Sequence, residues 1–246
     1  MKVAALIPAR LASTRFPTKP LAMILGKPMI LWVAELTSKA VGDANTYIAT
    51  DAKIIADVVR EAGFKVVMTS PDALTGTDRI AEAIREIEAD VFINVQGDEP
   101  MLDPASITKV VEASKQYPGS VVNGYAPISE DEDPANVNIP KCVIASDGRL
   151  LYMSRAAVPA YKSKEKRPKV YYKQVCIYAF TREQLEAYAA AGEKAPCEAP
   201  EDIEILRFLD MGYDIRMIEL PGDTLAVDAP SDIVAVERAM KEIEKL

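Results

Sequence analysis

Short apolar segments alternate with segments of helical periodicity through the first half of the chain, and this alternation restricts the fold more than any other feature. Strands that are apolar on both sides belong to a parallel sheet whose faces are covered by crossover helices. The pattern therefore predicts a doubly wound α/β sheet. We expect strands over residues 3–7, 46–49, 65–68 and 91–95, and helices over residues 29–39, 53–62, 77–87 and 104–116.

The rhythm changes in the second half, where strands dominate and a turn at Asp147-Gly148 separates two of them. We expect strands over residues 121–127, 142–145, 150–153, 170–180 and 214–220, and helices over residues 183–190, 201–211 and 230–244. The whole pattern indicates a single domain over residues 1–246, in which about residues 120–180 form an elaborated region.

The balance of 29 basic and 37 acidic side chains gives a net charge of −8, which argues against a large nucleic-acid-binding surface. Hydrophobic residues make up 49% of the 246, enough for an extensive core. No stretch approaches the ~20 consecutive apolar residues of a membrane helix, and residues 1–8 do not have the long apolar region of a signal peptide. We therefore expect a cytoplasmic protein without a membrane partner.

The chain contains no histidine, which excludes histidine-based triads, histidine-bound metals and imidazole acid–base catalysis. Its cysteines, Cys142, Cys176 and Cys197, are odd in number and widely spaced, so we expect neither a disulfide framework nor a thiolate zinc site. The chemistry must therefore rely on carboxylates, Lys, Arg, backbone amides or a hard cation.

A basic loop follows the first predicted strand. Residues 3–33 contain no acidic side chain, whereas Arg10, Arg15, Lys19 and Lys27 are basic, and the loop contains neither the dinucleotide glycine fingerprint nor a P-loop. Loops at the carboxyl ends of strands form the ligand sites of open α/β sheets, so we expect this loop to bind an anion. The alternative is a solvated basic loop.

Two aspartates occupy positions that suit a metal site. Asp98 follows the strand over residues 91–95 and stands next to Gly97, and Asp228 precedes Pro230 at the start of the last helix. A carboxylate at such a strand end suits a Mg²⁺ ion bound near phosphates. The alternative roles are a helix N-cap or a turn residue for Asp98 and a helix N-cap for Asp228.

A third segment, residues 69–79, joins the strand over residues 65–68 to the next helix. The backbone amides at a helix N-terminus bind anions. This segment could therefore read a base or an anion, and a simply capped loop is the alternative.

The same segments, in the same order, resemble the sugar-acid cytidylyltransferases, most closely those that act on 3-deoxy-manno-octulosonate (Kdo). The motifs that carry the resemblance lie at residues 7–10, 13–21, 26–30, 76–79, 96–100, 152–155 and 227–230. The resemblance implies a nucleotidyltransferase fold of the glycosyltransferase A type, with a doubly wound mixed sheet and an added β-rich dimerisation region. It also implies CTP as donor, a small acidic sugar as acceptor, Mg²⁺ as cofactor and a homodimeric assembly, with no nucleic-acid partner.

Carried over position by position, the resemblance implies roles for individual residues. The expected catalytic residues are Arg10, Lys19, Asp98 and Asp228, of which Asp98 and Asp228 would hold Mg²⁺. The expected CTP contacts are Ala9, Arg10, Ser13, Lys19, Thr69, Ser70, Gly76 and Thr77. The expected acceptor contacts are Arg15, Arg79, Gln96, Arg155, Gln174, Tyr178, Glu201 and Glu204. If the helix extends back to Glu198, then Glu198, Glu201 and Glu204 would share one of its faces.

Four positions depart from the family pattern: Gln174 and Ala73 each replace a usual His, Cys176 replaces a usual Gly, and Ile205 replaces a usual Gln. We expect transfer of CMP from CTP to an acid of the Kdo type, with release of pyrophosphate. An amide cannot become cationic and Ile cannot hydrogen bond, so the departures predict an acceptor that differs from Kdo at one substituent, or poorer use of Kdo. The alternatives are transfer to amino-Kdo, another nonulosonate or a phosphonate, or a non-catalytic nucleotide-binding module.

Overall fold

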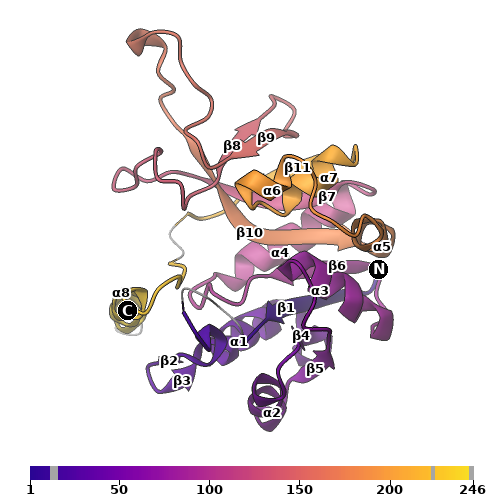
Figure 1. The fold of residues 1–246 in the computed structure, drawn as a ribbon. Coiled ribbons are helices and arrows are strands. Elements are labelled where there is room, and N and C mark those ends of the chain that lie inside the picture. The colour runs from indigo at the N-terminus through magenta and orange to yellow at the C-terminus, as the bar shows by residue number, and fades with distance from the viewer. Residues whose placement is uncertain (12–15, 223–224, 244–246) are drawn as a thin grey trace.

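The computed structural model describes residues 1–11, 16–222 and 225–243, and a nine-stranded mixed sheet forms its centre (Figure 1). The main path of the sheet has the order β11-β7-β10-β6-β1-β4-β5, and β8 joins it by pairing with β10 and β9. The strands are β1 (Val3–Ala9), β4 (Thr46–Thr50), β5 (Lys65–Met68), β6 (Val91–Val95), β7 (Val121–Pro127), β8 (Lys141–Ile144), β9 (Leu150–Ser154), β10 (Tyr172–Thr181) and β11 (Ile215–Glu219).

The middle of the sheet is parallel and buried. β1 pairs in parallel with β4 and β6, and β4 pairs in parallel with β5. β6 is buried at every position, as its continuous apolar sequence predicts. β10 runs antiparallel to β6 and β7, which makes the sheet mixed. The predicted fold class, a doubly wound mixed α/β sheet, is confirmed.

Helices cover both faces of the sheet. On one face α3, α5 and α7 pack through residues such as Ile80 and Phe208, and on the other α1, α2 and α4 pack through residues such as Ile30 and Ile107. The helices are α1 (Met29–Val41), α2 (Lys53–Glu61), α3 (Gly76–Ala83), α4 (Pro104–Gln116), α5 (Arg182–Ala190), α6 (Glu198–Glu201), α7 (Ile205–Asp210) and α8 (Asp232–Ile243).

The predicted strands agree with the observed ones to within two residues at each end. A small hairpin of β2 (Met23–Ile24) and β3 (Lys27–Pro28) has no counterpart in the sequence pattern, because two-residue strands show no periodicity. The helix predicted over residues 77–87 is shorter than expected, since α3 ends at Ala83 and continues as the 3₁₀ helix η3 (Ile84–Glu86).

The helix predicted over residues 201–211 is wrong at its start. Helices α6 and α7 replace it, and Asp202 between them has a left-handed backbone with φ 50°. The three carboxylates expected on one face bond to different elements: Glu198 to α7, Glu201 to β9 and Glu204 to the start of α3. One straight helix could not aim them in three directions, so the shared acidic face does not form.

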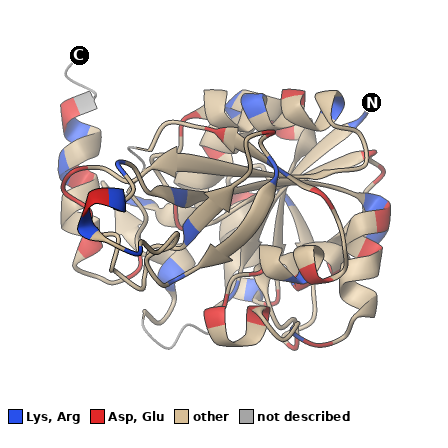
Figure 2. Ribbon diagram, turned by 90° about the horizontal axis from the view of Figure 1, so that it is seen from above, with Lys and Arg blue, Asp and Glu red and all other residues tan. Residues whose placement is uncertain are grey.

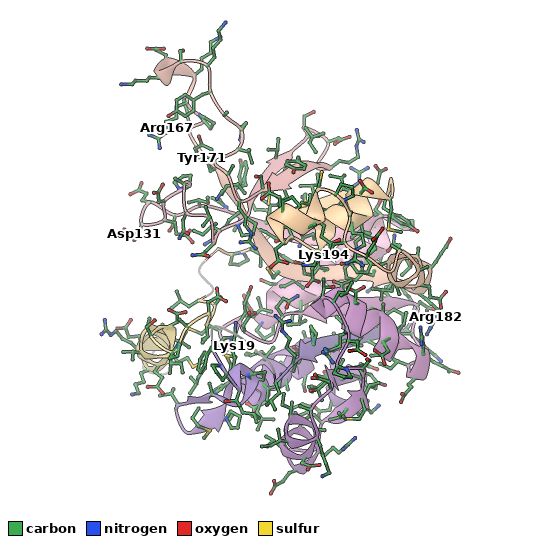
Figure 3. All side chains as sticks on the ribbon, viewed as in Figure 1. Lys19, Asp131, Arg167, Tyr171, Arg182 and Lys194 are labelled. Atoms are coloured by element: carbon green, nitrogen blue, oxygen red, sulfur yellow. The ribbon has the colours of Figure 1, made fainter. Side chains whose placement is uncertain are left out.

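The segment between β9 and β10 projects from the body of the molecule, with the 3₁₀ helix η4 (Lys164–Lys166) at its tip (Figure 1). Arg167 lies on this arm (Figure 3). The first and last described residues lie at opposite ends of the molecule (Figures 1 and 2). None of the helices described is long and apolar enough to cross a membrane.

Candidate active site

A cavity of about 260 Å³ opens at the carboxyl ends of β1 and β6, where α/β sheets bind ligands. Its wall also includes the 3₁₀ helix η1 (Lys19–Leu21), the start of α3 and the connection between α6 and α7. The lining residues are Pro8, Ala9, Arg10, Lys19, Pro20, Met29, Ala73, Leu74, Thr75, Gly76, Arg79, Gln96, Gly97, Asp98, Asp202, Glu204 and Asp228. Nine residues predicted for the site lie in this wall: Ala9, Arg10, Lys19, Gly76, Arg79, Gln96, Asp98, Glu204 and Asp228.

Lys19 joins two carboxylates from distant parts of the chain. Its Nζ lies 2.8 Å from Oδ2 of Asp98 and 3.3 Å from Oδ1 of Asp228. The backbone amide of Val227 donates to the carbonyl of Asp98 at 2.9 Å, so the two acidic segments also meet through their main chains. Figure 3 shows Lys19 between α8 and the sheet. The loop after β1, the turn after β6 and the C-terminal segment therefore converge at one point.

The Asp98 and Asp228 carboxylates form a pair of hard oxygen ligands. Because both reach the same amine, both could also reach one divalent cation of the kind that prefers oxygen ligands. Within residues 1–11, 16–222 and 225–243, no cluster of three or more acidic or cysteine side chains could hold a metal. Within the described residues, Asp98 and Asp228 could therefore supply two oxygen ligands to such a cation, and its other ligands would have to come from outside the protein.

The N-terminus of α3 is occupied by a carboxylate of the protein itself. The amides of Gly76 and Thr77 donate to Glu204 at 3.0 and 2.9 Å, and Thr75 caps the helix by accepting from the Asp78 amide. Burial raises the pKa of Glu204, while the hydrogen bonds from Thr77 and Gly76 act in the opposite direction. The amides expected to contact CTP are thus satisfied by Glu204, and only Gly76 of the pair lines the cavity.

Arg79 ties two loops to the side of the cavity. It is 3% exposed, and its Nη1 donates to Oγ1 of Thr69 at 2.5 Å and to the carbonyl of Ser70 at 3.2 Å. Asp51 lies 3.6 Å from the same atom. Burial lowers the pKa of Arg79, and the Asp51 charge opposes that shift. Thr69 and Ser70, predicted as CTP contacts, are not lining residues and hold Arg79 instead.

Arg155 and Glu201 lie behind the cavity wall. The Arg155 guanidinium donates to the carbonyls of Val137 at 2.9 Å, Asp202 at 3.1 Å and Glu201. The Glu201 carboxylate accepts from the Ser154 hydroxyl at 2.5 Å and from the Arg155 amide at 2.8 Å. These bonds position Asp202, which does line the cavity, so Arg155 and Glu201 act on the wall from its outer side.

Gln174 and Tyr178 are not among the lining residues of the cavity either, and they lie at a bulge in β10. The register of β10 against β7 shifts between Val175 and Tyr178, and Asn123 of β7 donates to the carbonyls exposed by the shift. Gln174 Nε2 donates to Asn123 Oδ1 at 3.0 Å and to the Tyr178 hydroxyl at 3.1 Å. Burial raises the pKa of Tyr178 well above its usual value. Gln174 therefore supports the bulge.

Two other departures from the family pattern, Ala73 and Ile205, lie in different places. Ala73 lines the cavity, whereas Ile205 is 1% exposed and belongs to the apolar core. The predicted contacts Ser13 and Arg15 lie outside the described residues.

Some residues that line the cavity were not predicted from the sequence. Asp202 is an unpredicted polar lining residue, and a single sequence carries no signal for its left-handed backbone. Gly97 permits a close approach, because a Cβ there would lie 3.2 Å from the carbonyl oxygen of Pro8. That contact explains why glycine follows Gln96 at this turn.

Comparison with known proteins places these features in context. A family model described as "Cytidylyltransferase" matches residues 4–215. The chain is 42% identical to an 8-amino-3,8-dideoxy-manno-octulosonate cytidylyltransferase of Shewanella oneidensis, over 98% of this chain and 99% of that protein. It is 38% identical to a 3-deoxy-manno-octulosonate cytidylyltransferase of Acidobacterium capsulatum, over 100% and 99% of the two chains.

A solved structure of CMP:2-keto-3-deoxy-manno-octonic acid synthetase complexed with CTP is similar over 98% of this chain and 99% of that one, with a TM-score of 0.90 and 35% identity. An inositol-1-phosphate CTP transferase from T. maritima shares the fold with a TM-score of 0.70 at 17% identity, over 99% and 96% of the two chains.

Proposed function

This chain belongs to the cytidylyltransferase family, and from that premise we propose that it transfers CMP from CTP to the anomeric hydroxyl of a sugar acid of the 3-deoxy-manno-octulosonate type. The single observation that supports the reaction is the convergence of Lys19, Asp98 and Asp228 in a cavity at the carboxyl edge of the sheet. In this reaction the acceptor hydroxyl oxygen bonds to the α-phosphorus and its proton passes to solvent. The bond between the α-phosphorus and the oxygen that bridges to the β-phosphate breaks, and pyrophosphate leaves with that electron pair.

The cations of the wall would bind the triphosphate. Arg10 and Lys19 reach the cavity from the loop after β1, and they would neutralise the charge that builds up on the leaving pyrophosphate. When CTP binds, Lys19 would exchange one of its present carboxylate partners for a phosphate oxygen. Arg79 also lines the cavity, and its remaining guanidinium N–H groups would donate to the sugar acid.

Asp98 and Asp228 would hold Mg²⁺, which when bound supplies charge stabilisation at the phosphates and lowers the pKa of the attacking hydroxyl. The fit rests on the two carboxylate oxygens that already share one cationic partner.

Two sugar acids are candidate acceptors for this reaction. The relatives at 42% identity act on the 8-amino sugar acid by name, and those at 38% act on the hydroxylated one. The 8-amino acid is therefore the second candidate.

Pyrophosphate release tests the proposal. Purified protein is mixed with CTP, Mg²⁺ and either Kdo, its 8-amino analogue, another nonulosonate or a phosphonate, and kcat/KM is compared. We expect turnover with an octulosonate, and the ratio of the two kcat/KM values identifies the natural acceptor. Binding of CTP without pyrophosphate release from any acceptor would instead support a non-catalytic nucleotide-binding module.

We also propose that the protein works as a homodimer in the cytoplasm, where CTP is available. Large apolar side chains are exposed on the elaborated region, and burial of such side chains favours association. They are Val137, Leu151, Tyr161 and Val170. Light scattering after size-exclusion chromatography tests this assembly, for which a mass near twice 26.8 kDa is expected.

A further inference from the structure

Helix α8 sits at one end of the molecule and is held by a small apolar cluster of its own. Figures 1 and 2 show it beside the body of the sheet, at the end opposite the N-terminus. Val236 and Met240 on its inner face are 0% and 8% exposed, and they pack with Ile24 and Met29. Trp32 of α1 packs against the same cluster. This cluster is separate from the two cores that cover the sheet.

One polar contact accompanies the apolar ones. The backbone amide of Leu25 donates to Oε1 of Glu237 at 2.9 Å, across 212 residues of sequence. Leu25 and Gly26 have φ angles of +47° and +79°, so they form the tight turn between β2 and β3. Glu237 therefore holds α8 to the tip of this hairpin.

Both partners of this contact lead directly to the reaction centre. The hairpin follows η1, which carries Lys19. On the other side, the amides of Asp228 and Ala229 both donate to Oδ2 of Asp232, the first residue of α8, at 2.8 Å. Asp228 is thereby attached to the start of the helix. The distance between Asp228 and Lys19 depends on how α8 is docked against the hairpin.

We propose that Glu237 is a positioning residue for the transfer reaction: its bond to the Leu25 amide seats α8 so that Asp228 faces Lys19 and Asp98. This inference rests on the proposed function, because it assigns Asp228 to the reaction centre. Glu237 does not line the cavity, so it acts only through the place that it gives to Asp228.

The test compares Glu237→Ala with Glu237→Gln, which keeps an acceptor oxygen, and with Glu242→Ala, which alters an exposed residue of the same helix. Docking is measured without turnover, by the fluorescence of Trp32 and by hydrogen exchange over residues 225–243. Trp32 is the only tryptophan of the chain, and its Nε1 donates to the carbonyl of Ile24 at 2.9 Å, within the contact area. CTP binding is measured by calorimetry in the presence of Mg²⁺, and kcat and KM are measured by steady-state kinetics.

We expect Glu237→Ala to shift Trp32 emission to the red and to speed exchange in α8. It should lower kcat by about tenfold to a hundredfold and leave KM for CTP within about threefold, because a displaced Asp228 affects the reacting phosphate most. Glu237→Gln should restore kcat to within about threefold of the wild type, and Glu242→Ala should change nothing. A purely structural role would predict loss of folded protein with an unchanged kcat per folded molecule.

Two results would overturn the inference: unchanged fluorescence and exchange in Glu237→Ala, or altered fluorescence and exchange with an unchanged kcat and unchanged CTP binding. If circular dichroism shows that Glu237→Ala is unfolded, Glu237→Gln is used for the test. Hydrogen exchange in α8 equal to that of the wild type, together with a tenfold lower kcat, would contradict positioning through this bond. Failure of the proposed function is a different result. In that case the wild type releases no pyrophosphate with any acceptor. The hydrogen-exchange, fluorescence and CTP-binding measurements would still show whether Glu237 positions α8.

Discussion

The amine of Lys19 lies between two carboxylates, and each of the three groups has a different part in the charge balance of the cavity. Replacing Asp98 with Asn removes one charge but keeps the size of the side chain. We expect a folded protein whose kcat falls by about 10² to 10³ or more, because a preorganised charge at the reacting phosphate is lost. Pyrophosphate release measures the effect.

Asp131→Asn is the matched control for Asp98→Asn, since Asp131 is exposed on a loop away from the cavity (Figure 3). It should leave kcat unchanged. Near-normal turnover by Asp98→Asn would contradict the role that the geometry suggests for this carboxylate.

Single carboxyl groups also determine how the free energy of unfolding changes with pH. Burial disfavours the Glu132 carboxylate, but hydrogen bonds from Lys173 and Ser129 outweigh burial, so the pKa of Glu132 lies below its usual value. Lys173 Nζ is 2.6 Å from Oε1 of Glu132. A carboxyl with a lowered folded-state pKa stabilises the fold above its unfolded pKa of about 4.3, and loses that contribution as pH falls through the folded value.

We therefore expect the free energy of unfolding of the wild type to fall more between about pH 6 and pH 3.5 than that of Glu132→Gln. Urea unfolding at both pH values measures the difference, and Glu130→Gln, an exposed neighbour, should behave like the wild type. Parallel pH profiles for the wild type and Glu132→Gln would contradict the assigned shift.

The position of a single residue can be predicted from the sequence where it is determined by the residue's own segment. Asp98 and Lys19 follow strands whose carboxyl ends form the ligand side of the sheet, so their place in the cavity wall could be expected. Arg155 and Gln174 depend on partners far along the chain, 47 residues away at Asp202 and 51 at Asn123. No local pattern encodes those partners, so the sequence could not show that neither side chain lines the cavity.

Among the elements, burial explains both the success and the failure of the sequence pattern. β6 and β7 have their predicted bounds because most of their residues are buried between neighbouring strands, and an apolar segment of that kind is visible in the sequence. The break between α6 and α7 follows from tertiary contacts instead. Periodicity measures burial on one face, and it contains no information about carboxylates that bond in different directions.

The same break creates a buried charge cluster that joins α7 to α3. Arg207 and Glu198 are each 1% exposed at the side chain, with Nε and Oε2 at 2.6 Å. Nη1 of Arg207 also donates to Oδ1 of Asp78 at 2.9 Å, and its guanidinium lies 3.7 Å from the Tyr188 ring centroid. Such a network holds the start of α3 against the α6–α7 segment.

Arg207→Leu should lower the free energy of unfolding by about 3 to 5 kcal/mol, because it leaves two carboxylates near the core without their cation. Urea unfolding measures the loss, with Arg238→Leu on exposed α8 surface as the control. A loss below about 1 kcal/mol would show that the cluster contributes little to stability.

For the whole molecule, CTP binding should raise the free energy of unfolding. CTP that binds only the folded state stabilises it by about 2.7 kcal/mol at about 100 times its Kd, which raises the Tm by about 5 to 10 °C. UTP at the same concentration should give a clearly smaller rise, as the family membership favours cytidine nucleotides. Equal rises in Tm with CTP and UTP, measured by differential scanning fluorimetry in Mg²⁺, would contradict that preference.

The convergence of Lys19 and Asp228 has a consequence during translation, because 209 residues separate them. At synthesis rates of about 5 to 20 residues per second, about 10 to 40 s pass between the emergence of the two side chains from the ribosome. A nascent chain that has reached residue 222 contains all the strands of the sheet and both Lys19 and Asp98, yet it has no Asp228 and no α8. If Asp228 has the role proposed above, the reaction centre of such a chain is still incomplete when the last strand has been made.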